Sequence, residues 1–204
     1  MRLILWTVTL ARLVAIPIFV WLAMDAQELA RAGLDPSTPR WGAIAAMLSI
    51  GVSDILDGWI ARRYDLTSQL GAMVDAVADK IAQVVFVAYL TLDVGPVFTA
   101  IPMWFLIIVF GRDITLLVGV SVLRLRYGPL HVVHRLHGRI ATLMIVAMIL
   151  WSAFGLPAWG ILPLGAVTSI LSVWSATIYA LDGAAQGEAI RADEREAMKA
   201  PEAP

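Results

Sequence analysis

The 204-residue chain contains no cysteine and few charged side chains. The lack of cysteine excludes disulfide bonds, zinc–thiolate sites and cysteine nucleophiles. Charged residues make up 15% of the chain, well below the roughly 25% of soluble domains, and the net charge of −1 gives no indication of a nucleic-acid partner. Hydrophobic residues instead reach 60%, and the mean hydropathy is +0.80. These values exclude an ordinary soluble domain.

Long apolar runs fill most of the chain, and their lengths predict an all-α, polytopic membrane protein with six transmembrane helices. A spanning helix needs about 20 apolar residues, so six of them with short loops use up the chain. We expect one membrane domain at residues 1–181 and a polar cytoplasmic tail at residues 182–204. The expected spans are residues 3–24, 41–61, 70–92, 97–122, 140–154 and 158–181, with a polar loop at residues 25–41.

Four aspartates interrupt the second and third of these apolar runs. Each ionised aspartate in mid-membrane costs about 2.5–3.5 kcal/mol on insertion scales, so the group needs compensation. Asp54 and Asp57 are three residues apart, Asp75 and Asp79 are four apart, and each pair therefore lies on one helix face. The polar break at residues 62–69 predicts a short turn. We expect an antiparallel hairpin of the second and third helices that brings the four carboxylates together.

The predicted carboxylate cluster indicates a metal site. Carboxylate oxygens are the ligands that Mg²⁺ and Mn²⁺ prefer, and two divalent ions would neutralise four negative charges. Two metal ions about 3.5–4 Å apart are a recurrent arrangement for displacement at phosphorus. The sequence therefore predicts Mg²⁺ or Mn²⁺ as the cofactor, with two ions bound by Asp54, Asp57, Asp75 and Asp79.

The aspartates form a longer pattern, D-x2-D-G-x2-A-R-x8-G-x3-D-x3-D, from Asp54 to Asp79. This pattern resembles the signature of the CDP-alcohol phosphotransferases, which join a CDP-linked lipid to an alcohol and release CMP. All eight signature positions are present. The resemblance implies that Asp79 is the general base as well as a metal ligand, since the last aspartate of the signature has the base role in that family. It further implies a CDP-lipid surface made by Asp54, Gly58, Ala61, Arg62 and Gly71.

The acceptor site is expected outside the signature. Arg112 and Asp113 resemble the "R-[DE]" of phosphatidylglycerophosphate and cardiolipin synthases, and Arg139 stands in their "G-K-x-x-T" at the lysine position. With Arg135, these arginines are candidate contacts for the acceptor. The resemblance implies transfer from CDP-diacylglycerol to glycerol 3-phosphate, with cardiolipin synthesis from phosphatidylglycerol as the alternative. The usual "D-P-x-A-D-K" lacks its proline in residues 75–80.

Several positions are open to a second interpretation. Arg12 is either a snorkelling anchor or a contact for a lipid phosphate. Arg112 could simply pair with Asp113, and Arg135 could lie in a solvated loop. A small carboxylate-based transporter is the alternative from another functional class, although the chain shows none of the internal repeats of such carriers.

The distribution of arginine and lysine predicts the orientation. Residues 31 and 40 are the only arginines in the expected outer loops. The N-terminus, the expected inner loops and the tail together hold ten arginines and lysines. The positive-inside rule then places both termini and the carboxylate hairpin on the cytoplasmic side of an inner (cytoplasmic) membrane. The expected partners are CDP-diacylglycerol, an alcohol acceptor and membrane lipids, and a homodimer is one assembly that the resemblance allows.

Overall fold

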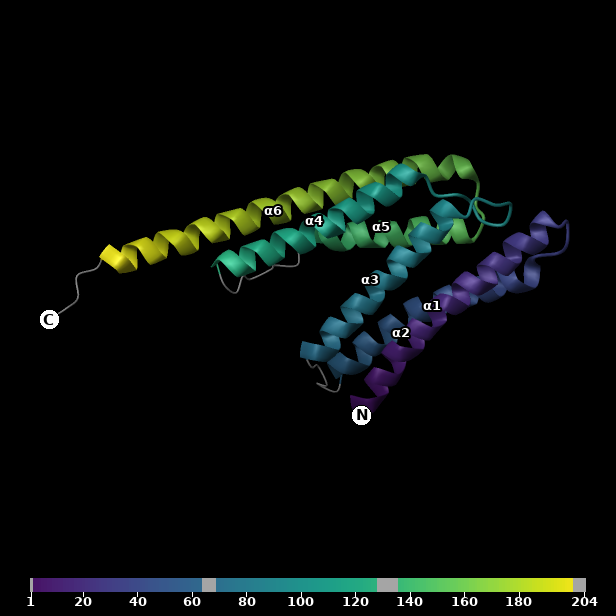
Figure 1. Ribbon diagram of the computed structural model, residues 1–204, viewed down its shortest axis with the longest axis horizontal. Coiled ribbons are helices and arrows are strands. Elements are labelled where there is room, and N and C mark those ends of the chain that lie inside the picture. The colour runs from purple at the N-terminus through teal and green to yellow at the C-terminus, as the bar shows by residue number, and fades with distance from the viewer. Residues whose placement is uncertain (1, 64–68, 128–135, 200–204) are drawn as a thin grey trace. The chain divides into compact units, whose positions relative to one another are not determined.

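Six α-helices and one short 3-10 helix make up the part of the chain that this computed structural model describes, residues 2–63, 69–127 and 136–199 (Figure 1). The helices are α1 (Arg2–Arg31), α2 (Ser37–Arg63), α3 (Gln69–Leu92), α4 (Met103–Tyr127), α5 (Leu136–Ala153), η1 (Ala158–Gly160) and α6 (Ile161–Lys199). For some of these residues the structure describes the backbone but not the side chain: 2–11, 54–63, 69–73, 123–124, 127, 136–139, 189–190 and 192–199. Within the described ranges, the all-α class and the six-helix count are confirmed.

The predicted polar loop at residues 25–41 is wrong in its extent, because helix occupies most of it. α1 continues to Arg31, and α2 already begins at Ser37. The segment before Arg31 consists of good helix formers, which outweigh its polarity. Gly33 then ends the helix with a φ of 73°, while Leu34 donates its N–H to the Leu29 carbonyl at 2.9 Å. This backbone pattern is a Schellman motif, which needs a left-handed residue such as glycine.

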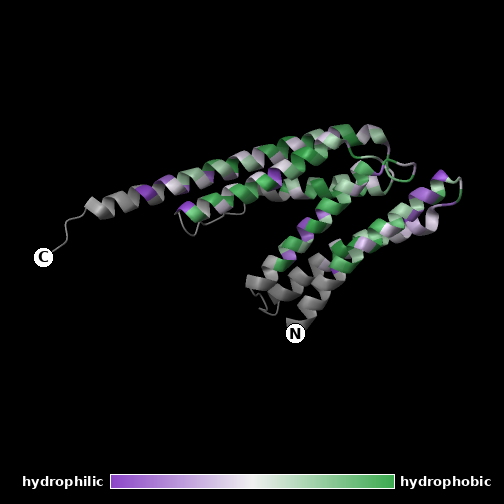
Figure 2. Cartoon of the chain, in the orientation of Figure 1, coloured by the Kyte–Doolittle hydropathy of each residue, from purple (hydrophilic) through white to green (hydrophobic). Residues whose placement is uncertain are grey.

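Apolar stretches long enough to cross a membrane occur in both halves of the chain. Among the described residues, three helical stretches meet the length and composition needed for a span: Arg12–Arg31, Met103–Val122 and Ala158–Glu188. A shorter apolar helix covers Ile140–Ala153. In Figure 2, apolar residues follow most of the described helices, and hydrophilic residues gather toward the C-terminal part of α6. These helices indicate an integral membrane protein.

The chain forms two compact units. The first contains residues 1–102 and 149–161, and the second contains residues 103–148 and 162–204. In the first unit, α1 packs against both α2 and α3. In the second, the backbone at Gly165 of α6 lies against Trp104 and Phe105 of α4 and against Met148 of α5. A larger side chain at Gly165 would displace these neighbours.

The buried side of α1 organises the first unit. Its members recur every three or four residues, as one helix face requires: Arg12, Ile16, Phe19, Ala23 and Gln27. Midway along this face, the Phe19 ring meets Phe86 of α3 edge to face, with ring centroids 4.7 Å apart. Aromatic pairs of this geometry add about 0.5–1.5 kcal/mol to the gain from area burial. The α1–α3 contact is therefore an apolar seam with polar groups at its two ends.

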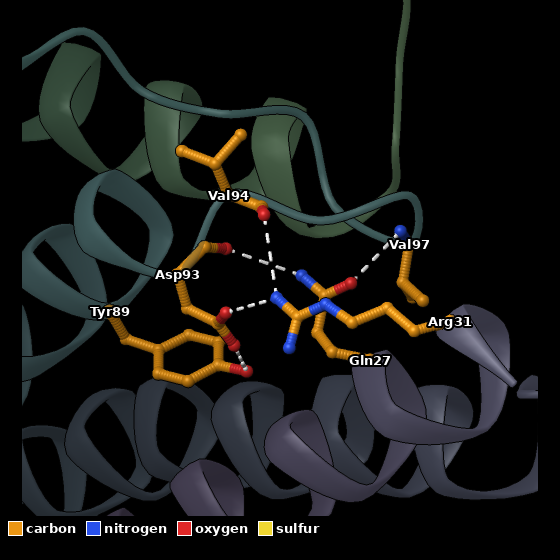
Figure 3. A network of polar contacts seen from close by, with 6 residues as sticks. All are labelled: Gln27, Arg31, Tyr89, Asp93, Val94 and Val97. Carbon is orange, nitrogen blue, oxygen red and sulfur yellow. Dashed lines mark hydrogen bonds and ion pairs between the residues drawn. The ribbon is translucent and has the colours of Figure 1, made fainter.

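At one end of the seam, Arg31 of α1 binds the segment that follows α3 (Figure 3). Its Nη2 lies 2.7 Å from Oδ1 of Asp93, whose Oδ2 accepts a hydrogen bond of 2.6 Å from the Tyr89 hydroxyl. The buried Gln27 amide donates to the Asp93 carbonyl at 3.3 Å and accepts from the Val97 N–H at 3.2 Å. The network ties the C-terminal end of α1 to the C-terminal end of α3. Because the two helices also pack along the seam, they run parallel.

Gly95 allows this network to close. A Cβ atom at this position would overlap the side-chain amide of Gln27. The glycine is required by close approach, because only hydrogen fits between the loop backbone and the buried amide.

The Asp93 carboxylate is expected to make the stability of the protein depend on acid pH. Burial opposes its ionisation, but hydrogen bonds from Tyr89 and Arg31 and the Arg31 charge outweigh burial and hold the pKa of Asp93 below its ordinary value of 3.8. A lowered native pKa stabilises the folded state above the ordinary value, and this contribution is lost as the pH falls through the native value. In detergent, lowering the pH from 6 to about 3 should therefore reduce the melting temperature of the parent protein more than that of Asp93→Asn.

The matched control for this titration is Glu28→Gln, which removes an exposed carboxylate from the same end of α1. It should follow the parent across the acid range. If Asp93→Asn and Glu28→Gln both titrate like the parent, the Asp93 network does not contribute to acid sensitivity.

Candidate functional site

At the other end of the α1–α3 seam, Arg12 joins two of the signature aspartates. Its Nη1 lies 2.6 Å from Oδ1 of Asp75 and 2.8 Å from Oδ1 of Asp79. These are short, charge-assisted contacts. The two aspartates are one helical turn apart on α3, as predicted, and they converge on a single nitrogen from another helix. The predicted pairing of Asp75 with Asp79 on one face of the helix is therefore seen in the structure.

The local sequence explains how Arg12 reaches this position. Arg12 begins an apolar stretch and lies on the same face as Ile16 and Phe19, so packing of that face against α3 carries the guanidinium inward. A charge in such a segment costs about 2.5–3.5 kcal/mol unless it is paired. The Arg12 side chain is 0% exposed, which shows that the snorkelling interpretation is wrong. Its partners include two carboxylates.

The carboxylates themselves keep an accessible side. The side chains of Asp75 and Asp79 are 36% and 39% exposed, in contrast to the fully buried Arg12. A carboxylate has two oxygens and up to four acceptor sites, so one contact from Arg12 does not exhaust it. The donor set and its exposure fit a hard divalent cation such as Mg²⁺ or Mn²⁺.

The other two predicted metal ligands lie on α2, where the structure describes the backbone but not these side chains. Asp54 and Asp57 both fall within α2. Among the described side chains, no group of three or more histidine, aspartate or glutamate residues gathers. The convergence of all four carboxylates therefore stays a prediction.

The predicted CDP-lipid surface falls in the same region. Gly58, Ala61 and Arg62 lie in the last turns of α2, and Gly71 lies in the first turn of α3. Their side-chain environment is outside the description. The backbone places them next to the α2–α3 connection.

Arg112, the first candidate for acceptor binding, lies in the second unit on α4. Its Nη1 is 3.3 Å from Oδ1 of the adjacent Asp113, and its side chain is 7% exposed. The Nε atom is buried and has no hydrogen-bond partner. The pairing with Asp113 that the sequence left open is present, but one donor of this buried guanidinium is left for another group.

The remaining candidates cannot be placed in a site. Arg139 lies in α5 with its side chain outside the description, and Arg135 lies outside the described residues altogether. Lys80, next to the signature, is exposed and lies 3.2 Å from the Gln83 side chain.

Sequence reasoning missed the partners of Arg12. The available signal was an arginine inside an apolar run, in a chain with four aspartates in other apolar runs, because buried charges of opposite sign tend to pair. Spacing within one helix could not reveal the match, since Arg12 and Asp75 are 63 residues apart.

Comparison with known proteins identifies the family of the chain. Residues 6–177 match the family model described as CDP-alcohol phosphatidyltransferase. A cardiolipin synthase (CMP-forming) of Streptomyces coelicolor is 36% identical over 121 residues, which are 59% of this chain and 50% of that protein. A probable phosphatidylglycerophosphate synthase of Mycobacterium tuberculosis is 32% identical over 117 residues, 57% of this chain and 49% of that protein.

A third relative matches over a shorter stretch. It is a CDP-diacylglycerol–glycerol-3-phosphate 3-phosphatidyltransferase of Rickettsia typhi, 36% identical over 73 residues, which are 36% of each protein. The chain thus spans half or less of the length of these curated relatives. No solved structure matches. Because the family match covers most of the chain and contains the whole aspartate signature, the protein belongs to the CDP-alcohol phosphatidyltransferase family.

Proposed function

We propose that the protein transfers a phosphatidyl group from CDP-diacylglycerol to an alcohol, with glycerol 3-phosphate as the acceptor and CMP as the leaving group. The observation that carries this proposal is the convergence of Asp75 and Asp79, two signature aspartates, on a buried arginine within the family region. Such a site holds two carboxylates accessible on one side, in a chain whose apolar helices suit a lipid substrate.

The register of α2 supports a larger cluster. Its buried positions Ala43, Met47 and Ile50 follow steps of four and three residues. The same steps lead to Asp54 and then Asp57. Because α1 packs against both α2 and α3, we infer that these aspartates approach Asp75 and Asp79 and complete a site for two divalent ions.

In the proposed reaction, different side chains of the protein have different roles. The acceptor hydroxyl attacks the phosphorus nearer the lipid, a new P–O bond forms, and the bond to CMP breaks. Asp79 takes the hydroxyl proton, since an alcohol is a weak nucleophile at neutral pH. Bound Mg²⁺ or Mn²⁺ would supply charge stabilisation at the pyrophosphate. Arg62 adds a fixed cation on the nucleotide side, and the small residues Gly58, Ala61 and Gly71 leave room for the substrate.

The acceptor assignment rests on fewer observations. Arg112 offers a buried donor suited to an anionic group, which both glycerol 3-phosphate and phosphatidylglycerol carry. Arg135 and Arg139 are further candidates from the sequence. Cardiolipin synthesis is the second candidate function, because the Streptomyces relative has that name. The homodimer that the resemblance allows stays a prediction.

Incubation of the purified protein with CDP-diacylglycerol and each acceptor tests the reaction. Glycerol 3-phosphate should yield phosphatidylglycerophosphate, identified by mass, and EDTA should abolish turnover until Mg²⁺ or Mn²⁺ is restored. If phosphatidylglycerol yields cardiolipin and glycerol 3-phosphate yields no product, the second candidate function, cardiolipin synthesis, is the correct one. Full turnover in excess EDTA would contradict the metal site while leaving the transfer reaction standing.

Two aspartate variants separate the base from the metal ligands. Asp79→Asn keeps an oxygen that can accept from Arg12 but cannot take the proton, so turnover should fall about 10²–10⁴-fold while CDP-lipid binding survives. Asp57→Asn should weaken metal binding first, so that high Mg²⁺ restores part of the rate. A Mg²⁺ titration of turnover and CDP-lipid binding measures both. Rescue of Asp79→Asn but not of Asp57→Asn would reverse the assignment.

We also propose that the protein lies in the inner membrane with its site on the cytoplasmic side, as the arginine distribution predicts. Thr38 lies at the end of the α1–α2 hairpin opposite the aspartates and is exposed. In this cysteine-free chain, Thr38→Cys should react with an impermeant maleimide added to intact cells. Ser68→Cys, in the α2–α3 connection, should react only after the membrane is opened. The reverse labelling pattern would invert the proposed orientation.

A further inference from the structure

The geometry points to Arg12 of α1 as a positioning residue that holds the Asp75 and Asp79 carboxylates in place for divalent metal binding. This inference rests on the proposed function, because it assigns a role toward the proposed metal site. It adds a third helix to a site that the aspartate signature confines to α2 and α3.

The contacts show how Arg12 would act. One nitrogen, Nη1, lies within 2.8 Å of an oxygen of each carboxylate. Two negative charges four residues apart on a helix repel each other, and a shared cation reverses this repulsion. Both carboxylates stay more than a third exposed while they contact Arg12, so each keeps surface that a divalent cation could reach.

Burial separates this role from a catalytic one. The Arg12 side chain is 0% exposed, whereas the carboxylates are each more than a third exposed on their other side. Arg12 therefore acts on metal and substrate through Asp75 and Asp79. Groups that orient metal ligands from behind in this way typically change metal affinity or activity 10–100-fold when they are removed.

The alternative explanation is that Arg12 only fastens α1 to α3. The chain offers a control for this, because Arg31 also ties α1 to the end of α3, through Asp93 directly after that helix, at 2.7 Å. Arg31 lies 19 residues further along α1, roughly 28 Å at 1.5 Å per residue, and it touches none of the signature aspartates. Both arginines fasten the same pair of helices, but Arg12 alone contacts predicted metal ligands.

The experiment measures Mn²⁺ affinity of the full chain in detergent by electron paramagnetic resonance, together with melting temperature in EDTA. Arg12→Met should weaken Mn²⁺ binding about 10–100-fold, while Arg31→Met should stay within about twofold of the parent. Both variants should melt below the parent without metal, because each loses an α1–α3 ion pair. Arg12→Lys should lie between the parent and Arg12→Met, since lysine keeps the charge on a shorter stem without the planar fork.

The outcomes decide the inference separately from the proposed function. Equal or tighter Mn²⁺ binding by Arg12→Met overturns the positioning role, as does an equal loss in Arg31→Met. If Arg12→Met does not fold, Arg12→Lys decides, and parental Mn²⁺ affinity in that variant overturns the role. A parent that forms the lipid product but binds no Mn²⁺ also overturns it. A parent that binds Mn²⁺ and forms no lipid product contradicts only the proposed reaction.

Discussion

Two ion pairs from one buried arginine hold one end of the α1–α3 seam together. Arg12 meets Asp75 and Asp79 at 2.6 and 2.8 Å within segments that are otherwise apolar. In such surroundings neither sign of charge is stable alone, so each requires the other. The helix that carries the arginine must therefore dock on α3 in one register, and the aspartates must face α1.

The rest of the α1–α3 seam is consistent with that register. The Phe19 and Phe86 rings meet in its middle, and Arg31, Gln27 and Asp93 close its far end. The polar groups at the two ends differ in kind. Those at the Asp93 end are satisfied among themselves, whereas the carboxylates near Arg12 keep one side accessible. The aspartate signature lies at the latter end.

This arrangement bears on how aspartates can work inside a lipid-facing protein. A cluster of carboxylates without a cation would be costly and mutually repulsive before substrate arrives. A built-in guanidinium beside two of the carboxylates lowers that cost. The proposed site would then combine stability of the folded chain with attraction for divalent ions, which metal-assisted transfer at phosphorus requires.

The sequence alone determined the helical class, the number of helices, the family and the pairing of aspartates along α3. These features depend on apolar run length and on spacing within one helix, both of which are local. It did not determine where α1 ends, because the glycine-terminated turn at Gly33 was hidden in a polar stretch. Nor did it identify the partners of Arg12. Only tertiary structure decided that, because the pairing of residues 63 and 67 positions apart depends on how two helices pack, which no local pattern encodes.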